Sequence, residues 1–242
     1  MIEARTDDAR SSHSRLTLWG GPVSPTSAVT GSKTVYIVDD DAGVRQALSS
    51  LLRSVGLRVE TFGSAHEFLA SPRTDSPSCL VLDVRLPDGS GLDVPDELNN
   101  LDVPLPIIFI TGHGTIPMSV RAMKSGALEF LTKPFRDDDL LGAIDVALER
   151  DRVARVDRSG QTEARHRIDR LTPREREVLD LVVTGKMNKQ IAAQLGTAEQ
   201  TVKQHRGRVM RKLEVDSVAE LIRVVERASG HAQSPAVLAR GS

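Results

Sequence analysis

The chain has 242 residues, of which 39% are hydrophobic, 27% charged and 3% aromatic, with a formal net charge of −1. The length suits two domains of ordinary size, and no apolar run approaches the roughly 18–20 residues that span a bilayer, which argues against a membrane protein. With a single cysteine, Cys79, and no apolar signal-peptide segment near residue 1, we expect a cytoplasmic protein without an internal disulfide.

Two charge regimes lie behind the near-neutral total. Residues 32–150 carry 11 Lys and Arg against 18 Asp and Glu, a balance of −7. Residues 162–228 carry 14 against 10, a balance of +4. An acidic part joined to a basic part indicates two separate tasks, and the basic part is the candidate for a polyanionic partner.

Residues 1–31 mix Ser, Thr, Gly and Pro with scattered charges, which predicts a disordered extension. Five short apolar runs then alternate with helical patterns. Because the runs are almost continuously apolar, they suit parallel strands that are covered on both faces. Residues 32–150 are therefore expected to form an α/β domain, a doubly wound five-stranded parallel sheet. The expected strands are 33–38, 57–62, 79–83, 106–111 and 127–132.

Start and stop signals place the helices between these strands. Apolar residues at 44, 48, 51, 52 and 55 predict an amphipathic helix, with Asp41 as its N-cap and Gly56 at its end. Ser64 and Glu67 fit a capping box for a second helix. Pro95 predicts that the third helix starts late or is irregular. The fifth helix is expected from about Asp137, past residue 150 and into a partly helical linker over 151–169.

An all-helical pattern fills residues 170–230, followed by a flexible tail over 231–242. Thr172, with Pro173 next and Glu175 three residues on, predicts a capping box. Gly185 ends this helix, and a short helix closed by Gly196 follows. A further capping box, Thr197 with Gln200, should open a third helix whose inward stripe is Val202, Val209 and Leu213.

Polar residues stand where the predicted strands end. Asp39 and Asp40 end the first strand, Asp83 the third and Thr111 the fourth, and Lys133 follows the fifth. The carboxyl ends of parallel strands share one edge of a sheet, so these side chains should converge. Clustered carboxylates suit a hard divalent cation, with Mg²⁺ favoured, and a carboxylate beside such an ion can attack phosphorus to give an aspartyl phosphate.

The first half resembles the receiver domain of two-component response regulators. The segments VYIVDDDAGVR, LVLDVRLPDGSGLD, IIFITGHG and ALEFLTKPF carry the resemblance. It implies Asp83 as phosphoacceptor and a cis bond between Lys133 and Pro134. It also implies Mg²⁺ ligands from Asp39, Asp40, Asp83 and the backbone carbonyl of Arg85, with Thr111 and Phe130 as switch residues and Lys133 pairing the phosphate.

Several of these residues also have plainer interpretations. Asp39 suits a solvated acidic loop, Thr111 a strand-end cap, Phe130 core packing and Lys133 an exposed turn. Arg85 and His113, each two residues past a site residue, have two interpretations: they tune hydrolysis of the acyl phosphate, or they are ordinary surface residues.

Basic residues concentrate on the helix after the tight turn of the second half. Residues 198–212 hold five Lys and Arg against one acid, Glu199. Two helices joined by a Gly-containing turn form a helix-turn-helix pattern, and a one-signed face on the second of them favours DNA binding over an ordinary solvated face.

This half resembles the LuxR/NarL-type DNA-binding domain, through LTPREREVL, NKQIAAQLG, TVKQHRGRVMRKL and SVAELIRVV. Together the two halves look most like FixJ-type regulators. The resemblance implies that helix 198–212 enters the major groove of double-stranded promoter DNA. Base edges would face Lys203, Gln204 and Gly207, and phosphates would lie nearer Lys189, Arg206, Arg208 and Lys212. Gly207 would permit close approach to DNA, or alternatively make room for a neighbouring side chain.

The sequence thus predicts a transcriptional regulator, not an enzyme. It would accept a phosphoryl group on Asp83 from a sensor histidine kinase, bind no membrane, and dimerise on phosphorylation. Two alternatives remain: a Mg²⁺-dependent phosphohydrolase with an aspartyl-phosphate intermediate, and a DNA-binding regulator that is independent of phosphorylation.

Overall fold

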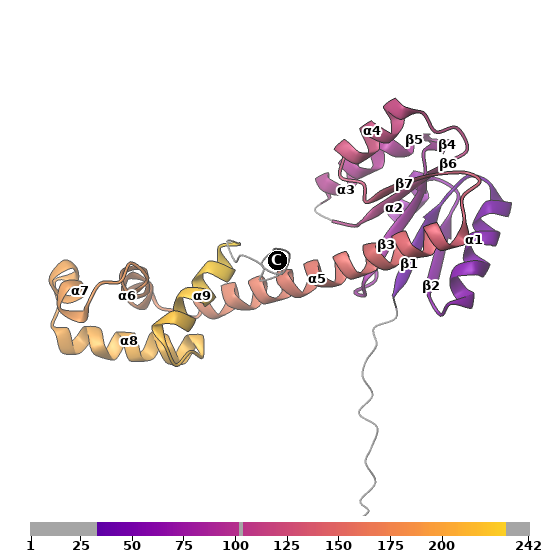
Figure 1. Ribbon diagram of the computed structural model, residues 1–242. Coiled ribbons are helices and arrows are strands. Elements are labelled where there is room, and N and C mark those ends of the chain that lie inside the picture. Colours follow the sequence, from indigo (N-terminus) through magenta and orange to yellow (C-terminus); the bar gives the residue numbers. More distant parts are fainter. Residues whose placement is uncertain (1–32, 102–103, 231–242) are drawn as a thin grey trace, which may run out of the picture. The chain divides into compact units, whose positions relative to one another are not determined.

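The computed structural model describes residues 33–101 and 104–230 (Figure 1). The predicted extension over 1–31 and the tail over 231–242 lie outside these residues. Among the described residues, no helix combines the length and apolar character needed to cross a membrane.

A five-stranded parallel sheet forms the first half, as predicted. Its strand order is β2-β1-β3-β6-β7. The chain first moves outward from β1 to β2 and then crosses back to β3 on the other side of β1, so a topological switch point lies at the carboxyl ends of β1 and β3. Every residue of β1 and β3 is buried, because helices cover both faces of the sheet. The strands are β1 (Thr34–Val38), β2 (Arg58–Phe62), β3 (Ser78–Asp83), β6 (Ile107–Thr111) and β7 (Glu129–Thr132).

Helices pack on the two faces of this sheet in the doubly wound arrangement. Buried side chains of α1 and α5 cover one face, and those of α2, α3 and α4 cover the other. A two-stranded hairpin of β4 (Arg85–Leu86) and β5 (Gly89–Ser90) follows β3. The helices are α1 (Ala42–Ser54), α2 (Ala65–Ala70), α3 (Val94–Asn100), α4 (Ile116–Lys124) and α5 (Asp137–Asp169).

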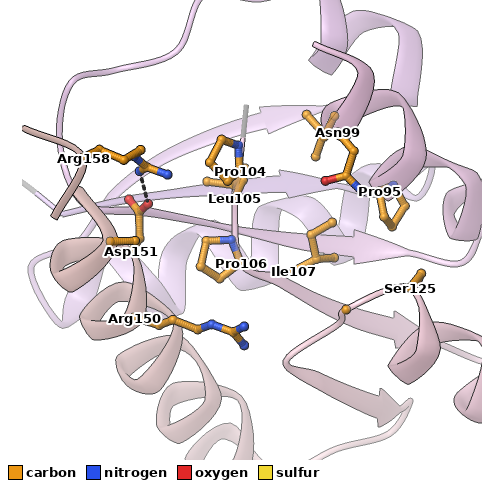
Figure 2. Close-up of a pocket in the computed structure, with 13 residues that line it drawn as sticks. Pro95, Asn99, Pro104, Leu105, Pro106, Ile107, Ser125, Arg150, Asp151 and Arg158 are labelled. Carbon is orange, nitrogen blue, oxygen red and sulfur yellow. Dashed lines mark hydrogen bonds and ion pairs between the residues drawn. The ribbon is translucent and has the colours of Figure 1, made fainter. Parts of the chain in front are cut away.

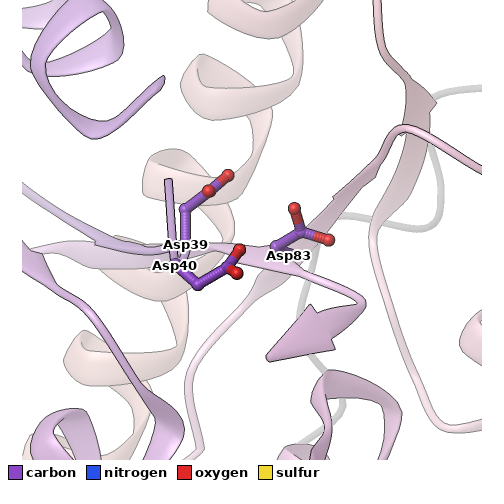
Figure 3. Close-up of side chains that lie close together, drawn as sticks. All are labelled: Asp39, Asp40 and Asp83. Atoms are coloured by element: carbon purple, nitrogen blue, oxygen red, sulfur yellow. The ribbon is translucent and has the colours of Figure 1, made fainter. Parts of the chain in front are cut away.

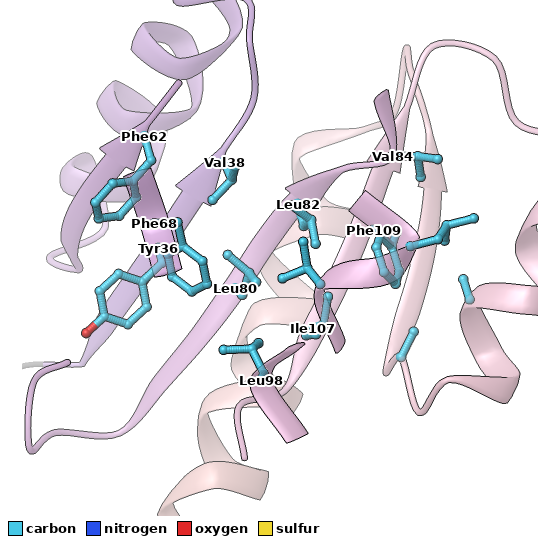
Figure 4. Close-up of a cluster of buried hydrophobic side chains, with 14 residues drawn as sticks. Tyr36, Val38, Phe62, Phe68, Leu80, Leu82, Val84, Leu98, Ile107 and Phe109 are labelled. Atoms are coloured by element: carbon cyan, nitrogen blue, oxygen red, sulfur yellow. The ribbon is translucent and has the colours of Figure 1, made fainter. Parts of the chain in front are cut away.

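Alternate residues of each central strand supply two separate apolar layers. Tyr36, Leu80 and Phe109 point to the layer under α2, α3 and α4 (Figure 4). Val81 and Cys79 belong to the other layer. Cys79 is a buried strand residue, as expected, and burial raises the pKa of its thiol well above the usual range.

The starts of α1 and α2 follow the local sequence signals with one difference. Asp41 accepts hydrogen bonds from the amides of Gly43 and Val44 at the start of α1. Ser64 caps α2 as predicted, by accepting from the Glu67 amide. The Glu67 carboxylate, however, accepts from the amide of Gly63 and not from that of Ser64, so the capping box is displaced by one residue.

The third helix starts irregularly, as Pro95 predicted. A 3-10 turn over Gly91–Asp93 precedes it, and Pro95 lies in its first turn, where a missing amide hydrogen costs little. Gly91 is required here, because a Cβ at this position would lie 2.1 Å from the backbone oxygen of Asp83.

Helix α5 is longer than predicted. The sequence suggested a partly helical linker over 151–169, but α5 is continuous from Asp137 to Asp169. The buried carboxylate of Asp151 explains part of the difference. It accepts from the Ser78 amide at 2.8 Å, where β3 begins, and from Arg155 Nε at 2.6 Å, one helical turn further on.

Four helices form the second half around their own core. Val202, Val209 and Leu213 are buried in it, which confirms the predicted inward stripe. The Thr172 hydroxyl accepts from the Glu175 amide and the Glu175 carboxylate accepts from the Thr172 amide, which closes the capping box of the first helix. The helices are α6 (Pro173–Val183), α7 (Asn188–Leu195), α8 (Glu199–Leu213) and α9 (Val218–Ala228).

The second predicted capping box in this half was wrong. Helix α8 begins at Glu199, its N-cap is Ala198, and no side chain caps it. The Thr197–Gln200 spacing is one residue out of phase because Gly196 takes a left-handed conformation, with a φ of 61°, and closes α7 first.

Candidate functional site

Three carboxylates gather at the carboxyl end of the sheet, where β1 and β3 stop. Asp39, Asp40 and Asp83 each offer an oxygen, and these oxygens lie within 4.8 Å of one another (Figure 3). Asp39 is fully buried, Asp83 is 7% exposed and Asp40 is exposed. The predicted convergence is therefore found for these three residues.

Lys133 completes the cluster from the loop after β7. Its Nζ lies 2.6 Å from Asp39 Oδ2 and 2.7 Å from Asp83 Oδ2. The peptide bond between Lys133 and Pro134 is cis, as the resemblance implied. The ammonium partly compensates two carboxylates that would otherwise repel each other in a buried site.

The surroundings of the site shift the pKa values of Asp39 and Lys133. Burial raises the pKa of Asp39, although hydrogen bonds from Lys133 and from the Asp41 amide oppose this effect. Burial also disfavours the charged form of Lys133, but its hydrogen bonds to Asp39 and Asp83 outweigh that, so its pKa is raised. Lys133 therefore stays charged, and negative charge in the cluster remains costly until a cation shares it.

Backbone contacts hold the carboxylates in place. The Asp41 amide donates to Asp39 Oδ1 and the Arg85 amide donates to Asp83 Oδ1, both at 2.9 Å. Arg45 Nη1 donates to the backbone oxygen of Asp39 at 2.5 Å. Sequence reasoning missed Arg45. Its place on α1, one turn after the Asp41 cap, is the signal that would have found it.

Thr111 is the last residue of β6, and Phe130 lies in the neighbouring strand β7. The buried Thr111 hydroxyl accepts from the His113 amide at 3.3 Å, so it acts as a strand-end cap in this state. Phe130 is partly buried against the core. A Cβ at Gly114 would lie 3.2 Å from Phe130 and 3.5 Å from the Thr111 methyl, whereas the space at Gly112 is open.

The donor set fits a hard divalent cation. Only oxygen ligands point into the cluster, from one exposed and two buried carboxylates, and no histidine or cysteine is among them. Oxygen-only sites of this kind suit Mg²⁺, with waters completing the shell. The backbone carbonyl of Arg85, two residues after Asp83, stays a predicted ligand.

A second candidate site is the outer face of α8. Lys203, Gln204, Gly207 and Arg208 are exposed there, and Lys189 is exposed on α7. A Cβ added at Gly207 would meet nothing within 4 Å, so no neighbouring side chain in the described part of the protein requires this glycine.

Two of the predicted phosphate contacts hold other partners in the structure. Arg206 Nη1 donates to Asn188 Oδ1 at 3.1 Å and so joins α8 to α7. Lys212 Nζ lies 2.6 Å from Glu175 Oε2 and donates to the Arg170 carbonyl at 3.0 Å. Lys212 thus ties α8 to the buried capping box of α6.

Two family descriptions match the chain. The response regulator receiver domain matches residues 35–145, and the luxR family of bacterial regulatory proteins matches residues 169–225. Nodulation protein W of Bradyrhizobium diazoefficiens is 53% identical over 208 residues, which cover 86% of this chain and 91% of that protein. The chain is a response regulator.

Other relatives share both halves of this response regulator. FixJ of Rhizobium meliloti, named a transcriptional regulatory protein, is 41% identical over 79% of this chain and 94% of its own. The solved structure of the response regulator StyR has a TM-score of 0.74 and 48% identity, over 81% of this chain and 99% of that one.

Membership of the family joins the two sites in one protein. This response regulator couples a receiver domain, which implies a kinase as phosphodonor, to a LuxR-type DNA-binding domain. Among its relatives, FixJ is named a transcriptional regulatory protein and TodT of Pseudomonas putida a response regulator protein. The FixJ-like architecture predicted from the sequence is therefore confirmed.

Proposed function

We propose that Asp83 accepts a phosphoryl group from a sensor histidine kinase and that the outer face of α8 then binds promoter DNA. The observation that carries the first step is the buried Asp83 carboxylate, 2.7 Å from Lys133 Nζ and grouped with Asp39 and Asp40. These residues match a nucleophile, a phosphate-pairing cation and two metal ligands.

In the transfer, an Asp83 carboxylate oxygen attacks the phosphorus of the phosphohistidine. The new O–P bond forms as the P–N bond breaks, and the electron pair leaves with the imidazole nitrogen. Lys133 pairs with phosphoryl oxygens, which then replace its contact with Asp83. Asp39, Asp40, Asp83 and the backbone carbonyl of Arg85 would hold Mg²⁺, which would offset the charge on the phosphoryl oxygens.

The acceptor can be tested by labelling with acetyl phosphate, with and without Mg²⁺, followed by intact mass. The wild type should gain one phosphoryl group only when Mg²⁺ is present, and Asp83→Asn should gain none. Asp93→Asn is the matched control. Asp93 is a nearby aspartate that follows β3 in the chain, but it is exposed and pairs with Arg121 at the surface. Equal labelling of Asp83→Asn would overturn the proposal.

The same experiment separates the two alternatives. Steady release of inorganic phosphate from small phosphoesters would favour a phosphohydrolase, whereas a family of DNA-binding regulators argues against an enzyme. An unlabelled wild-type protein that still binds DNA would favour regulation without phosphorylation.

For DNA, we propose that Lys203, Gln204 and Gly207 face base edges. Lys189, Arg206 and Arg208 would lie nearer the phosphates. All but Arg206 are exposed, which supports this assignment. Lys212 is instead given a structural role, because Glu175 already holds its ammonium group.

Phosphorylation would reach DNA binding through dimerisation. If Thr111 turns toward the phosphoryl group, Phe130 can move into the space it leaves and alter the surface of α4, β7 and α5. Helix α4 exposes Ile116 (81%) and Met123 (50%), an apolar surface suited to a second copy. Two joined DNA-binding domains would then read a roughly palindromic site.

A further inference from the structure

A cavity of about 330 Å³ lies at the edge of the sheet opposite the three aspartates. It is formed where α5 passes the start of β6, the end of α3 and the turn after α4 (Figure 2). Its size falls in the range of small-molecule sites in proteins, roughly 300–1,000 Å³. Neither the phosphorylation site nor the face of α8 includes any of its lining residues.

One side of the cavity is apolar and the other is polar. Leu98 of α3 and Ile107 of β6 are buried behind it, and Leu105 and Ala154 line it from the preceding turn and from α5. Three prolines also line it, including Pro104. Such walls favour a ligand with an apolar body, because burying that body removes apolar surface from water.

The polar side of the cavity carries a positive excess. Asp151 is 2% exposed, and its carboxylate accepts from Ser78, Arg155 and Arg158, so its charge is compensated within the protein. Arg150 extends beneath Pro106 toward Ile107 (Figure 2), and over residues 33–101 and 104–230 its guanidinium has no ion pair or hydrogen bond. A guanidinium of this kind can hold a carboxylate with two parallel hydrogen bonds.

We propose that this cavity binds a small organic anion with an apolar body, held by a carboxylate or sulfonate on Arg150. The apolar body would pack against Leu98, Leu105 and Ala154. Divalent cations would be repelled by the positive excess, and a neutral polar ligand would leave the apolar walls unmatched. A dinucleotide exceeds the volume.

The position of this cavity would let a bound ligand influence the DNA-binding half through α5. Arg150 and Ala154 belong to α5, and further along the same helix Arg165 Nε donates to the Ala228 carbonyl of α9 at 2.8 Å. A ligand that joins α3 and β6 to α5 would stabilise this helix where it leaves the sheet. The cavity would therefore serve as a second input, independent of Asp83.

Titration of the full-length protein with 2-naphthoate, followed calorimetrically, tests the proposal. We expect one saturable site in the wild type, with affinity at least about tenfold weaker in Arg150→Met, since a charge-assisted pair contributes on that scale. The uncharged 2-naphthylmethanol has a matched shape. The wild type should bind it at least about tenfold more weakly than it binds 2-naphthoate.

Two further variants make the outcome decisive. Arg152→Met is the control, because Arg152 is an exposed arginine of the same helix that pairs with Glu149 and does not line the cavity. It should bind like the wild type. Ala154→Phe should abolish binding by filling the space, with its thermal unfolding showing that it folds. Absence of saturable binding, or equal affinities of Arg150→Met and wild type, would overturn the proposal.

Discussion

The three consecutive aspartates after β1 have three different roles because successive residues leave the strand in different directions. Asp39 is fully buried and bonds Lys133. Asp40 is exposed and offers an oxygen to the cluster, where we propose that it recruits a cation. Asp41 points to the helix, where it caps two amides of α1 near the positive end of the dipole.

Gly207 is a residue whose role can be separated from helix stability. It lies exposed inside α8, and nothing surrounds the position of a Cβ. Gly207→Ala should therefore stabilise the second half by about 0.5–1 kcal/mol. If Gly207 permits close approach to a base edge, the same substitution should weaken specific DNA binding at least severalfold. Thermal unfolding and binding to a duplex selected from random sequences measure the two effects.

Gly142→Ala provides the control for that prediction. Gly142 is likewise an exposed glycine within a helix, α5, with no atom near a Cβ, and it lies far from α8 in the chain. It should stabilise the protein without changing DNA affinity. An unchanged DNA affinity of Gly207→Ala would show that this glycine has no role at the interface.

At the scale of elements, Asp151 joins α5 to the start of β3. Asp151→Asn would remove the charge that Arg155 and Arg158 share and leave two guanidiniums beside a weaker acceptor. We expect a loss of about 1–3 kcal/mol, because the buried Asp151 side chain loses its charge-assisted hydrogen bonds, while Arg155 keeps its pair with Asp75. Faster hydrogen exchange of the Ser78 amide should accompany it.

Asp145→Asn is the matched substitution on the same helix. Asp145 is exposed and forms no hydrogen bond or ion pair with the described residues, so its replacement should change stability by less than about 0.5 kcal/mol. Similar effects of the two substitutions would contradict the anchoring role of Asp151.

The contact between α6 and α8 predicts a pH dependence. Hydrogen bonds from Lys212, and then from the Thr172 amide, lower the pKa of the Glu175 carboxyl from its ordinary value of 4.5. Because the folded pKa is the lower one, this stability is fully present above pH 4.5 and is lost as the pH falls through the folded value. Glu175→Gln should lower stability at pH 7 by about 1–2 kcal/mol, since Lys212 is partly exposed.

The difference between Glu175→Gln and wild type should shrink below pH 4.5, as measured by denaturant unfolding of the two proteins across pH. Glu177→Gln serves as the control, because Glu177 lies on the same helix but is half exposed and pairs with Arg174 at the surface. It should cost less than about 1 kcal/mol. A difference for Glu175→Gln that does not vary with pH would contradict the ionic contribution.

For the whole molecule, phosphorylation should produce a dimer. Sedimentation with and without acetyl phosphate and Mg²⁺ should show the change in the wild type and not in Asp83→Asn. Ile116→Lys should be labelled normally yet remain monomeric, because a charge would enter the apolar surface of α4.

Leu101→Lys controls for surface charge alone, since Leu101 is exposed at the end of α3. It should dimerise like the wild type, and duplex affinity should follow the dimer in each case. Dimerisation of Ile116→Lys equal to that of wild type would place the interface elsewhere.

Local patterns in the sequence were enough to predict most elements and the acidic site. Continuous apolar runs, and an aspartate or threonine at the ends of three strands, depend only on neighbours in the chain and on the shared edge of a parallel sheet. For this reason the five strands, the group of Asp39, Asp40 and Asp83, and the stripe of Val202 on α8 were all anticipated.

The tertiary structure alone decided what depends on partners distant in sequence. Asp151 of α5 bonds the Ser78 amide, 73 residues away, and Lys212 bonds Glu175, 37 residues away. The cavity beside Arg150 exists only because α3, β6 and α5 meet there. Sequence periodicity records which face of a helix is buried, but a polar side chain can bond any group that folding brings within reach, so its partner is known only once the chain has folded.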